Sequence, residues 1–128
     1  MESSILLKAQ MQARRMYTLL SEVQDLSRQL AEALDRDDQV TVRMLVSMRG
    51  EPMEKLRLTR RALEEQRDSL PEGDRARLAA LLNGAEAESE EESALAAQIQ
   101  INTRLFQQVL ELDKALNRRI TRKKSIYK

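Results

Sequence analysis

The stretch from Ala94 to Ile120 constrains the fold of this chain more than any other. Neither proline nor glycine interrupts it, and its large apolar residues recur mostly at steps of three and four, which places them on one stripe of an α-helix. At about 1.5 Å per residue this helix is roughly 40 Å long. A rod of this kind cannot bury its stripe alone, so other helices or another molecule must cover it. The stripe consists of Leu95, Ile99, Leu105, Phe106, Val109, Leu112, Leu116 and Ile120.

Two earlier stretches carry the same periodicity. The first predicts a long helix from about residue 4 to residue 34, with Ser3 or Ser4 as its N-cap. The second runs from Val42 to Leu70 and keeps its phase across Gly50-Glu51-Pro52. Proline disturbs a helix interior, so this pattern predicts a helix that kinks at Pro52 rather than a wide loop.

Turn signals separate these stretches. Asp37 or Asp38 is placed to cap the second helix by accepting a backbone N–H. A short helix is predicted from Arg75 to about Leu82, with Asp74 as its N-cap and Asn83-Gly84 as its end. The final helix is then predicted from about residue 90 to residue 122.

The composition agrees with long helices. The 128 residues include three glycines, two prolines and three aromatic residues, whereas sheets favour β-branched and aromatic residues. The sequence therefore predicts an all-α fold in one domain, residues 1–128. Its architecture is an elongated antiparallel bundle of three long helices plus one short helix, with coiled-coil-like packing.

The sequence lacks the residue types on which most active sites depend. Without histidine or cysteine, the usual general base, thiol nucleophile and metal ligands are missing. No glycine-rich phosphate loop occurs, and the glutamates between residues 86 and 92 lack the loop and glycine of a calcium site. We therefore expect no enzyme, no cofactor and no metal.

Charge and hydropathy limit the kinds of partner that the chain is expected to bind. The net charge of +1 offers no global electrostatic case for nucleic acid, although residues 114–128 hold seven basic residues and no acidic one. This segment is either a solvated, frayed helix end or a docking peptide anchored by Ile126 and Tyr127. The apolar runs are too short to span a bilayer, and the N-terminus has no signal-peptide core. We expect a cytoplasmic protein without membrane insertion.

Three features each allow two interpretations. Asn102, on the apolar stripe, either sets the register of a helix seam or donates a hydrogen bond to a partner. The glutamates at 86, 88, 90, 91 and 92 form either a solvated helix start or an acidic docking patch. The methionines either fill an irregular core or line a surface that accepts several partners. They are Met11, Met16, Met44, Met48 and Met53.

Several short motifs occur in a fixed order. The first helix ends in the acidic turn LDRDD at 34–38, which leads into VRMLV at 42–46. Met48-Arg49 and MEKL at 53–56 follow, the last helix carries NTRL at 102–105, and Tyr127 lies beyond it. This layout resembles the flagellar type III export chaperones that escort hook-associated proteins, the FlgN-type family.

The resemblance implies a cytoplasmic chaperone that binds the amphipathic terminal helices of hook-associated proteins and delivers them to the type III export apparatus. It implies that Tyr127 docks on the export gate, with gate or ATPase components as further partners. It also implies that the final helix offers part of its stripe to a substrate helix by helix-in-groove recognition. Those residues are Leu105, Phe106, Val109, Leu112, Leu116 and Ile120.

Two alternatives stay open. A structural coiled-coil assembly or adaptor subunit would seal the stripe between identical copies in a homo-oligomer. A small nucleic-acid-binding regulator would use residues 114–128 and bind with strong salt dependence. The chaperone interpretation differs from both because it requires an apolar surface that is incompletely covered in the monomer.

Overall fold

The computed structural model describes residues 1–126, with side chains for residues 1–122. In chain order its helices are α1 (Ser3–Asp35), α2 (Gln39–Asp68), α3 (Glu72–Leu82) and α4 (Glu90–Ile126). No strand occurs within this part of the chain. The prediction of an all-α bundle with three long helices and one short helix is confirmed.

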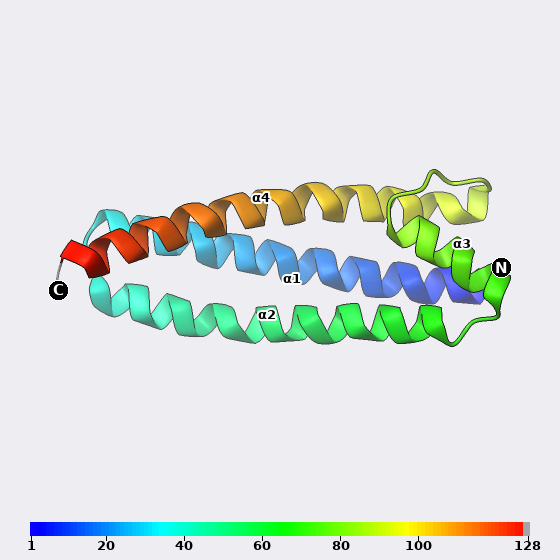
Figure 1. Cartoon of the computed structure of the whole chain (residues 1–128), viewed down its shortest axis with the longest axis horizontal. Helices are drawn as coiled ribbons and strands as arrows, with labels where there is room; N and C mark the ends of the chain where they lie inside the picture. Colours follow the sequence, from blue (N-terminus) through cyan, green and yellow to red (C-terminus); the bar gives the residue numbers. More distant parts are fainter. Residues whose placement is uncertain (127–128) are drawn as a thin grey trace.

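The helix α1 forms the centre of the elongated molecule, and α2 and α4 pack along its two sides (Figure 1). The helices α1 and α2 are antiparallel neighbours. In contrast, α4 runs parallel to α1, because residues 83–89 carry the chain back to the end of the bundle at which α3 begins. The strict up-and-down alternation is therefore broken at α3, which is too short to cross the bundle.

Local chemistry explains most helix ends. The Asp38 carboxylate accepts the Thr41 backbone N–H at 3.1 Å, as predicted for the cap of α2. Hydrogen bonds from the Thr41 side chain and backbone hold the pKa of Asp38 below its usual value. Gly84, with φ of 98°, ends α3 in the left-handed conformation that glycine adopts readily.

Two predicted caps are wrong. Ser3 and Ser4 lie inside α1, whose N-cap is Glu2 and which has no side-chain cap. The helix α3 begins three residues earlier than predicted, so Asp74 lies in its first turn. Its carboxylate there complements the positive end of the helix dipole without capping it.

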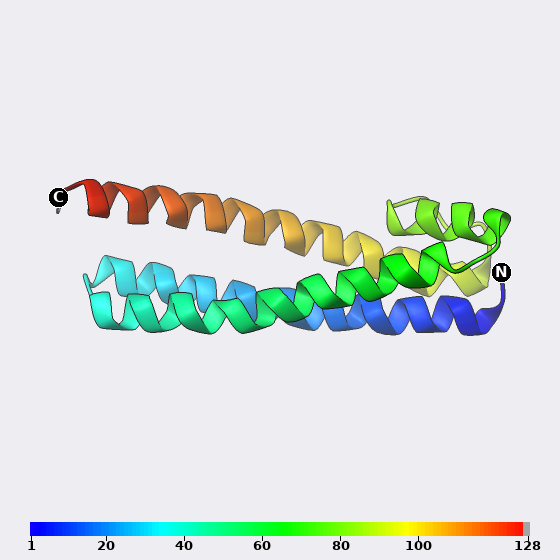
Figure 2. The same ribbon diagram turned by 60° about the horizontal axis from the view of Figure 1, so that its bottom comes forward.

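The helix α2 continues through Pro52, as predicted, rather than breaking into a loop. Figure 2 shows α2 bending near its middle, which fits the carbonyl clash and the missing donor of an internal proline. Pro52 is itself buried.

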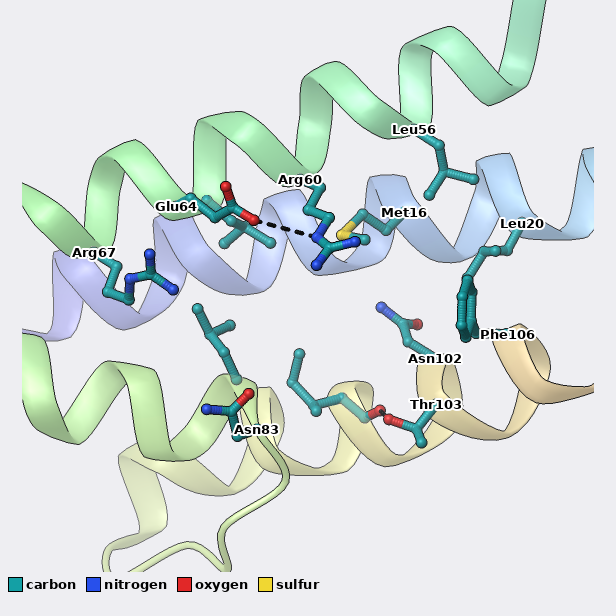
Figure 3. A pocket seen from close by; sticks show the side chains of 13 residues that line it. Met16, Leu20, Leu56, Arg60, Glu64, Arg67, Asn83, Asn102, Thr103 and Phe106 are labelled. Carbon is teal, nitrogen blue, oxygen red and sulfur yellow. Dashed lines mark hydrogen bonds and ion pairs between the residues drawn. The ribbon is translucent and has the colours of Figure 1, made fainter. Parts of the chain in front are cut away.

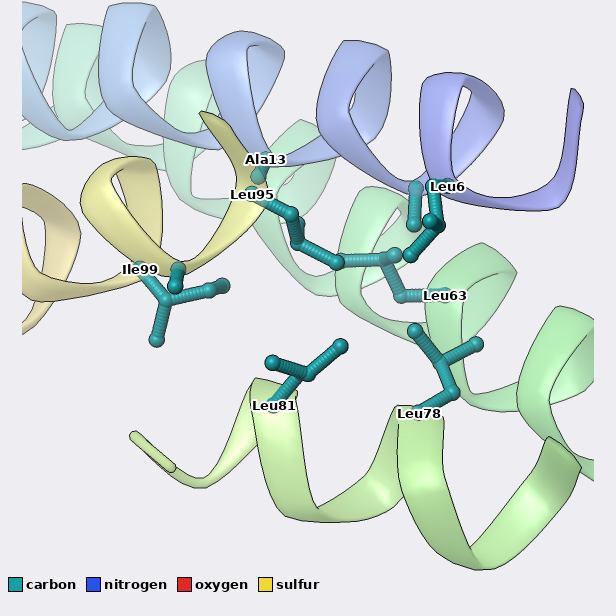
Figure 4. Close-up of a cluster of buried hydrophobic side chains, with 9 residues drawn as sticks. Leu6, Ala13, Leu63, Leu78, Leu81, Leu95 and Ile99 are labelled. Atoms are coloured by element: carbon teal, nitrogen blue, oxygen red, sulfur yellow. The ribbon is translucent and has the colours of Figure 1, made fainter. Parts of the chain in front are cut away.

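The core consists of three clusters strung along α1. At the end where α1 begins, all four helices contribute residues (Figure 4), namely Leu6, Ala9, Ala13, Leu63, Leu78, Leu81, Leu95, Ala96 and Ile99. The central cluster joins α1 to α4 through Leu20, Val23, Leu105 and Val109. The third cluster closes the opposite end with Leu26, Leu30, Ala33, Leu34, Leu45 and Leu116.

None of the helices within residues 1–126 combines the length and the hydropathy that crossing a membrane requires.

Candidate functional site

The short helix α3 occupies a slot between α2 and α4. Leu78 and Leu81 are completely buried and belong to the same cluster as Leu63 of α2 and Leu95 of α4 (Figure 4). Over the described residues the backbones of α2 and α4 do not approach each other closely, since both pack against α1. Thus α3 is the fourth helix of the bundle, but only at one end.

Beyond the last residues of α3 the same slot is open. It forms a groove of about 520 Å³ whose walls come from all four helical segments (Figure 3). We call it the α3-end groove. Its lining consists of Met16, Leu20, Leu56, Arg60, Leu63, Glu64, Arg67, Leu82, Asn83, Ile99, Asn102, Thr103 and Phe106.

The floor of the α3-end groove is apolar, and charge is confined to its α2 wall. Leu20 and Leu63 are buried at its base. On the α2 wall, Arg60 donates its Nε to Glu64 at 3.2 Å, drawn as a dashed line in Figure 3. Arg67 donates its Nε to Asp68 at 2.9 Å, and this hydrogen bond lowers the pKa of Asp68. An apolar cleft with a charged edge is suited to an amphipathic ligand.

Asn102 fixes the relation between α4 and α1 beneath the groove. Its Nδ2 donates to the Ala13 backbone carbonyl at 2.8 Å, and its Oδ1 accepts from Gln98 at 3.0 Å. Because the amide is engaged within the chain, these bonds favour the register-setting interpretation over a donor held for a partner.

An ion pair joins α2 to α4 farther along the bundle. Arg49 donates to Asp113 at 2.5 Å, and Arg49 is only 8% exposed. Its Nε is buried without a hydrogen-bond partner. The pair connects α2 to α4 directly, and neither residue lines the α3-end groove.

The six stripe residues implied to bind a substrate separate into two groups. Phe106 is 50% exposed and lines the α3-end groove. The other five belong to the intramolecular core: three are buried among α1 side chains, and two are half-buried beside the third cluster. The three buried residues are Leu105, Val109 and Leu116, and the two half-buried residues are Leu112 and Ile120. Tyr127 lies outside the described residues.

Sequence reasoning missed most of the groove lining. Met16, Leu20, Leu56 and Leu63 lie on α1 and α2, whereas the resemblance implies binding residues on the final helix alone. Their periodicity is that of ordinary core positions, so no local signal separates them from buried neighbours. The end point of α3 determines which of them line the open groove.

The glutamate-rich segment contains one buried member. The Glu92 carboxylate accepts hydrogen bonds from Arg77 of α3, at 2.6 Å from Nη2, and from the Glu88 backbone N–H at 2.9 Å. These bonds lower the pKa of Glu92 from 4.5 to about 2. The interaction fastens α3 to α4, and Glu90 and Glu91 of the first turn remain exposed.

The methionines lie mostly at the surface. Met16 is half-buried in the α3-end groove, and the other four are about half exposed or more. The interpretation that they fill the core is wrong for those four, which are Met11, Met44, Met48 and Met53.

Comparisons with protein-family models, with curated proteins and with solved structures find no match for this chain. Among residues 1–126 no group of three or more acidic side chains is arranged to hold a metal ion.

Proposed function

We propose that this chain is a cytoplasmic flagellar export chaperone that binds an amphipathic terminal helix of a hook-associated protein in the α3-end groove and delivers it to the type III export apparatus. The observation that carries the proposal is a helix slot that α3 fills at one end and leaves open at the other. In this account the protein is a binding module without catalytic activity or cofactor.

The helix α3 supports this proposal because it shows what the slot accepts. Leu78 and Leu81, three residues apart on one helix face, fit between Leu63 of α2 and Leu95 of α4. A partner helix with large apolar residues at steps of three and four would place its side chains on the open floor in the same manner. It would extend the four-helix cross-section beyond α3.

Phe106 is the best candidate for an anchor contact. Its ring is half exposed on the groove side of α4, and aromatic side chains dominate the energy of many interfaces. Covering it would remove a large apolar surface from water at little cost to the core, because its neighbour Leu105 already holds α4 to α1.

A binding measurement with two matched variants tests the proposal. The ligands are peptides that span the terminal amphipathic helices of flagellar hook-associated proteins, and the assay is isothermal titration calorimetry. Phe106→Ser removes the groove contact. Ile101→Ser is the control, because Ile101 is 47% exposed on the same helix and does not line the groove.

We expect the wild-type chain and Ile101→Ser to bind alike, and Phe106→Ser to bind about tenfold to a hundredfold more weakly, in the range of a hot-spot residue. Equal weakening by both serine variants would place the interaction elsewhere on α4. Absence of binding to any of these helices would contradict the chaperone function.

One observation favours the structural alternative. Val40 and Met44 are 72% and 53% exposed, lie four residues apart on α2, and continue to the half-exposed Met48. Such an apolar strip could be sealed between two copies. Sedimentation equilibrium distinguishes the two accounts: a tight oligomer that Met44→Lys dissociates would favour an assembly subunit.

A further inference from the structure

We infer that a second copy of this chain covers the outer face of α2, packing antiparallel to it in a weak symmetric dimer that leaves the α3-end groove free. The inference goes beyond the proposed function and does not depend on it. It follows from the exposure of this face, from the order of its residues, and from the area that it offers. The α2 outer face consists of Met44, Met48, Glu51, Lys55, Leu58 and Ala62.

The α2 outer face is one continuous helix surface. Its six positions follow one another at steps of four and three, so they lie within about 80° of arc and extend over about 27 Å of helix. Within the described part of the chain, the other helices leave about half of Met44, Met48 and Leu58 uncovered. Apolar side chains that recur at this spacing are typical of a seam between two helices.

The order of residues on this face is complementary to itself in the reverse direction. The steps are four, three, four, three and four, which are symmetric about the point midway between Glu51 and Lys55. A second α2 laid antiparallel about a twofold axis at that point sets Met48 against Leu58 of the other copy. It also sets Met44 against Ala62, and the axis repeats both contacts. A symmetric dimer requires a self-complementary surface of this kind.

The two charged positions select the antiparallel orientation. Within one chain the Lys55 Nζ lies 3.0 Å from the Glu51 Oε1, with the two side chains 49% and 76% exposed, and a pair so solvated contributes little by itself. In the antiparallel dimer Glu51 also faces Lys55 of the other copy. Four charges then alternate in sign, and each keeps its own partner while it gains a second one. A parallel pair of helices would set like charges against each other.

The size of the face predicts a weak dimer. A strip about 27 Å long and about 10 Å wide, the diameter of a helix, gives each copy roughly 300 to 400 Å² of contact. The total from two copies is below the ~1,200 Å² of a small stable interface, which is typical of weak, reversible association. We therefore expect a dissociation constant on the order of 100 µM.

The α3-end groove lies on a different face of α2. Leu56 and Arg60, which line the groove, are about 120° and 160° around the helix from the middle of the outer face. The six outer-face residues are not among those that line the groove. Each copy in the dimer can therefore still receive a partner helix.

Charge reversal on the outer face tests the dimer. The association of the full chain is measured by sedimentation equilibrium from about 10 µM to about 1 mM. Glu51→Lys and Lys55→Glu each give the face two like charges, so that four like charges would meet in the dimer. The matched control is Arg57→Glu, which also breaks an exposed ion pair within α2, to Glu54 at 2.6 Å, but lies outside the outer face. Circular dichroism checks that each variant keeps its helices.

We expect the wild-type chain and Arg57→Glu to dimerise alike. The Glu51→Lys and Lys55→Glu variants should each dimerise at least about tenfold more weakly at low salt. An equal mixture of these two variants should form a heterodimer, because two lysines then face two glutamates. High salt should reduce all of these differences.

Single cysteines test the orientation, since the sequence has no cysteine of its own. In a mixture of Met48→Cys and Leu58→Cys chains, mild oxidation should link the two variants to each other. Each variant alone should cross-link poorly. In the antiparallel dimer the two copies of one position are ten residues apart along the helices, about 15 Å, which exceeds the reach of a disulfide.

A chain that stays monomeric at about 1 mM would overturn the inference and leave the outer face to a different protein. Equal weakening by Arg57→Glu, no heterodimer in the mixture, or cross-linking of each cysteine variant mainly with itself would also overturn it. The proposed function is tested separately, because Lys55→Glu leaves the groove intact. Failure of this variant and of the wild-type chain to bind hook-associated helices would contradict the proposed function alone.

Discussion

Replacing Glu92 by glutamine should destabilise the chain by an amount that disappears in acid. The carboxylate accepts three strong hydrogen bonds: two from Arg77, at 2.6 Å (Nη2) and 3.0 Å (Nε), and one from the Glu88 N–H at 2.9 Å. The amide of glutamine keeps one acceptor oxygen and loses the charge, so the bonds to the guanidinium weaken.

The size of the stability loss expected for Glu92→Gln follows from the pKa of Glu92. The fall from 4.5 to about 2 corresponds to an upper limit of about 3 kcal/mol, at about 1.36 kcal/mol per pKa unit. The Arg77 side chain is 22% exposed, so water screens part of this interaction. We expect the variant to lose about 2 kcal/mol of unfolding free energy at pH 7.

The sign of the pH dependence is fixed by the direction of the shift. A carboxyl whose folded-state pKa is depressed stabilises the fold fully above its unfolded pKa, here near pH 4.5. This contribution is lost as the pH falls from about 4.5 to about 2. The stability difference between the wild-type chain and Glu92→Gln should shrink over the same window.

Urea unfolding followed by circular dichroism at pH 7, 4.5, 3 and 2 measures this difference. The matched control is Glu91→Gln, which removes the same charge from the same helical turn but at an exposed position. We expect that control to change stability by less than about 0.5 kcal/mol. A difference for Glu92→Gln that stays constant from pH 7 to pH 2, or that Glu91→Gln reproduces, would show that the Glu92 carboxylate does not stabilise the fold through Arg77.

Three further predictions concern the packing of the bundle. Leu30→Ala, at a completely buried position, should cost about 2 to 5 kcal/mol in urea unfolding, whereas Leu58→Ala, at 50% exposure, should cost less than about 0.5 kcal/mol. Asp113→Ala should cost about 1 to 3 kcal/mol because it leaves Arg49 buried without its partner, and the double variant with Arg49→Met should recover part of that loss; no recovery would argue against the ion pair. Asn102→Ala should cost about 1 to 3 kcal/mol because it removes the amide donor to α1, and unchanged stability would show that the seam does not depend on this hydrogen bond.

The positions of the helices could be predicted from the sequence because their cause is local. Apolar residues at steps of three and four define α1, α2 and α4 to within a few residues, and Asp38 and Gly84 give readable boundary signals. The N-caps of α1 and α3 were predicted wrongly. Several residues near each helix start could serve as an N-cap, but no side chain forms the cap hydrogen bond at either helix.

The direction of α4 and the position of the groove could not be predicted in this way. Both depend on how far α3 reaches along the slot, and that is set by the short helix and the returning loop at residues 83–89. Leu105 and Phe106 illustrate the same limit. They are adjacent in sequence and about 100° apart around the helix, so one faces α1 and the other faces the groove. Periodicity places both on a broad stripe without showing which flank is covered.

Binding of a helix in the α3-end groove can be followed through the methionine methyl groups of the protein. Met16 lines the groove, whereas Met11, Met44 and Met48 are exposed outside its lining, so labelled methyl groups report on several surfaces in one spectrum. On titration with a hook-associated terminal helix, the account predicts a large chemical-shift change at Met16 and small changes at the other three. Changes concentrated at Met44 and Met48, with Met16 unmoved, would contradict the account and place the partner on the outer face of α2.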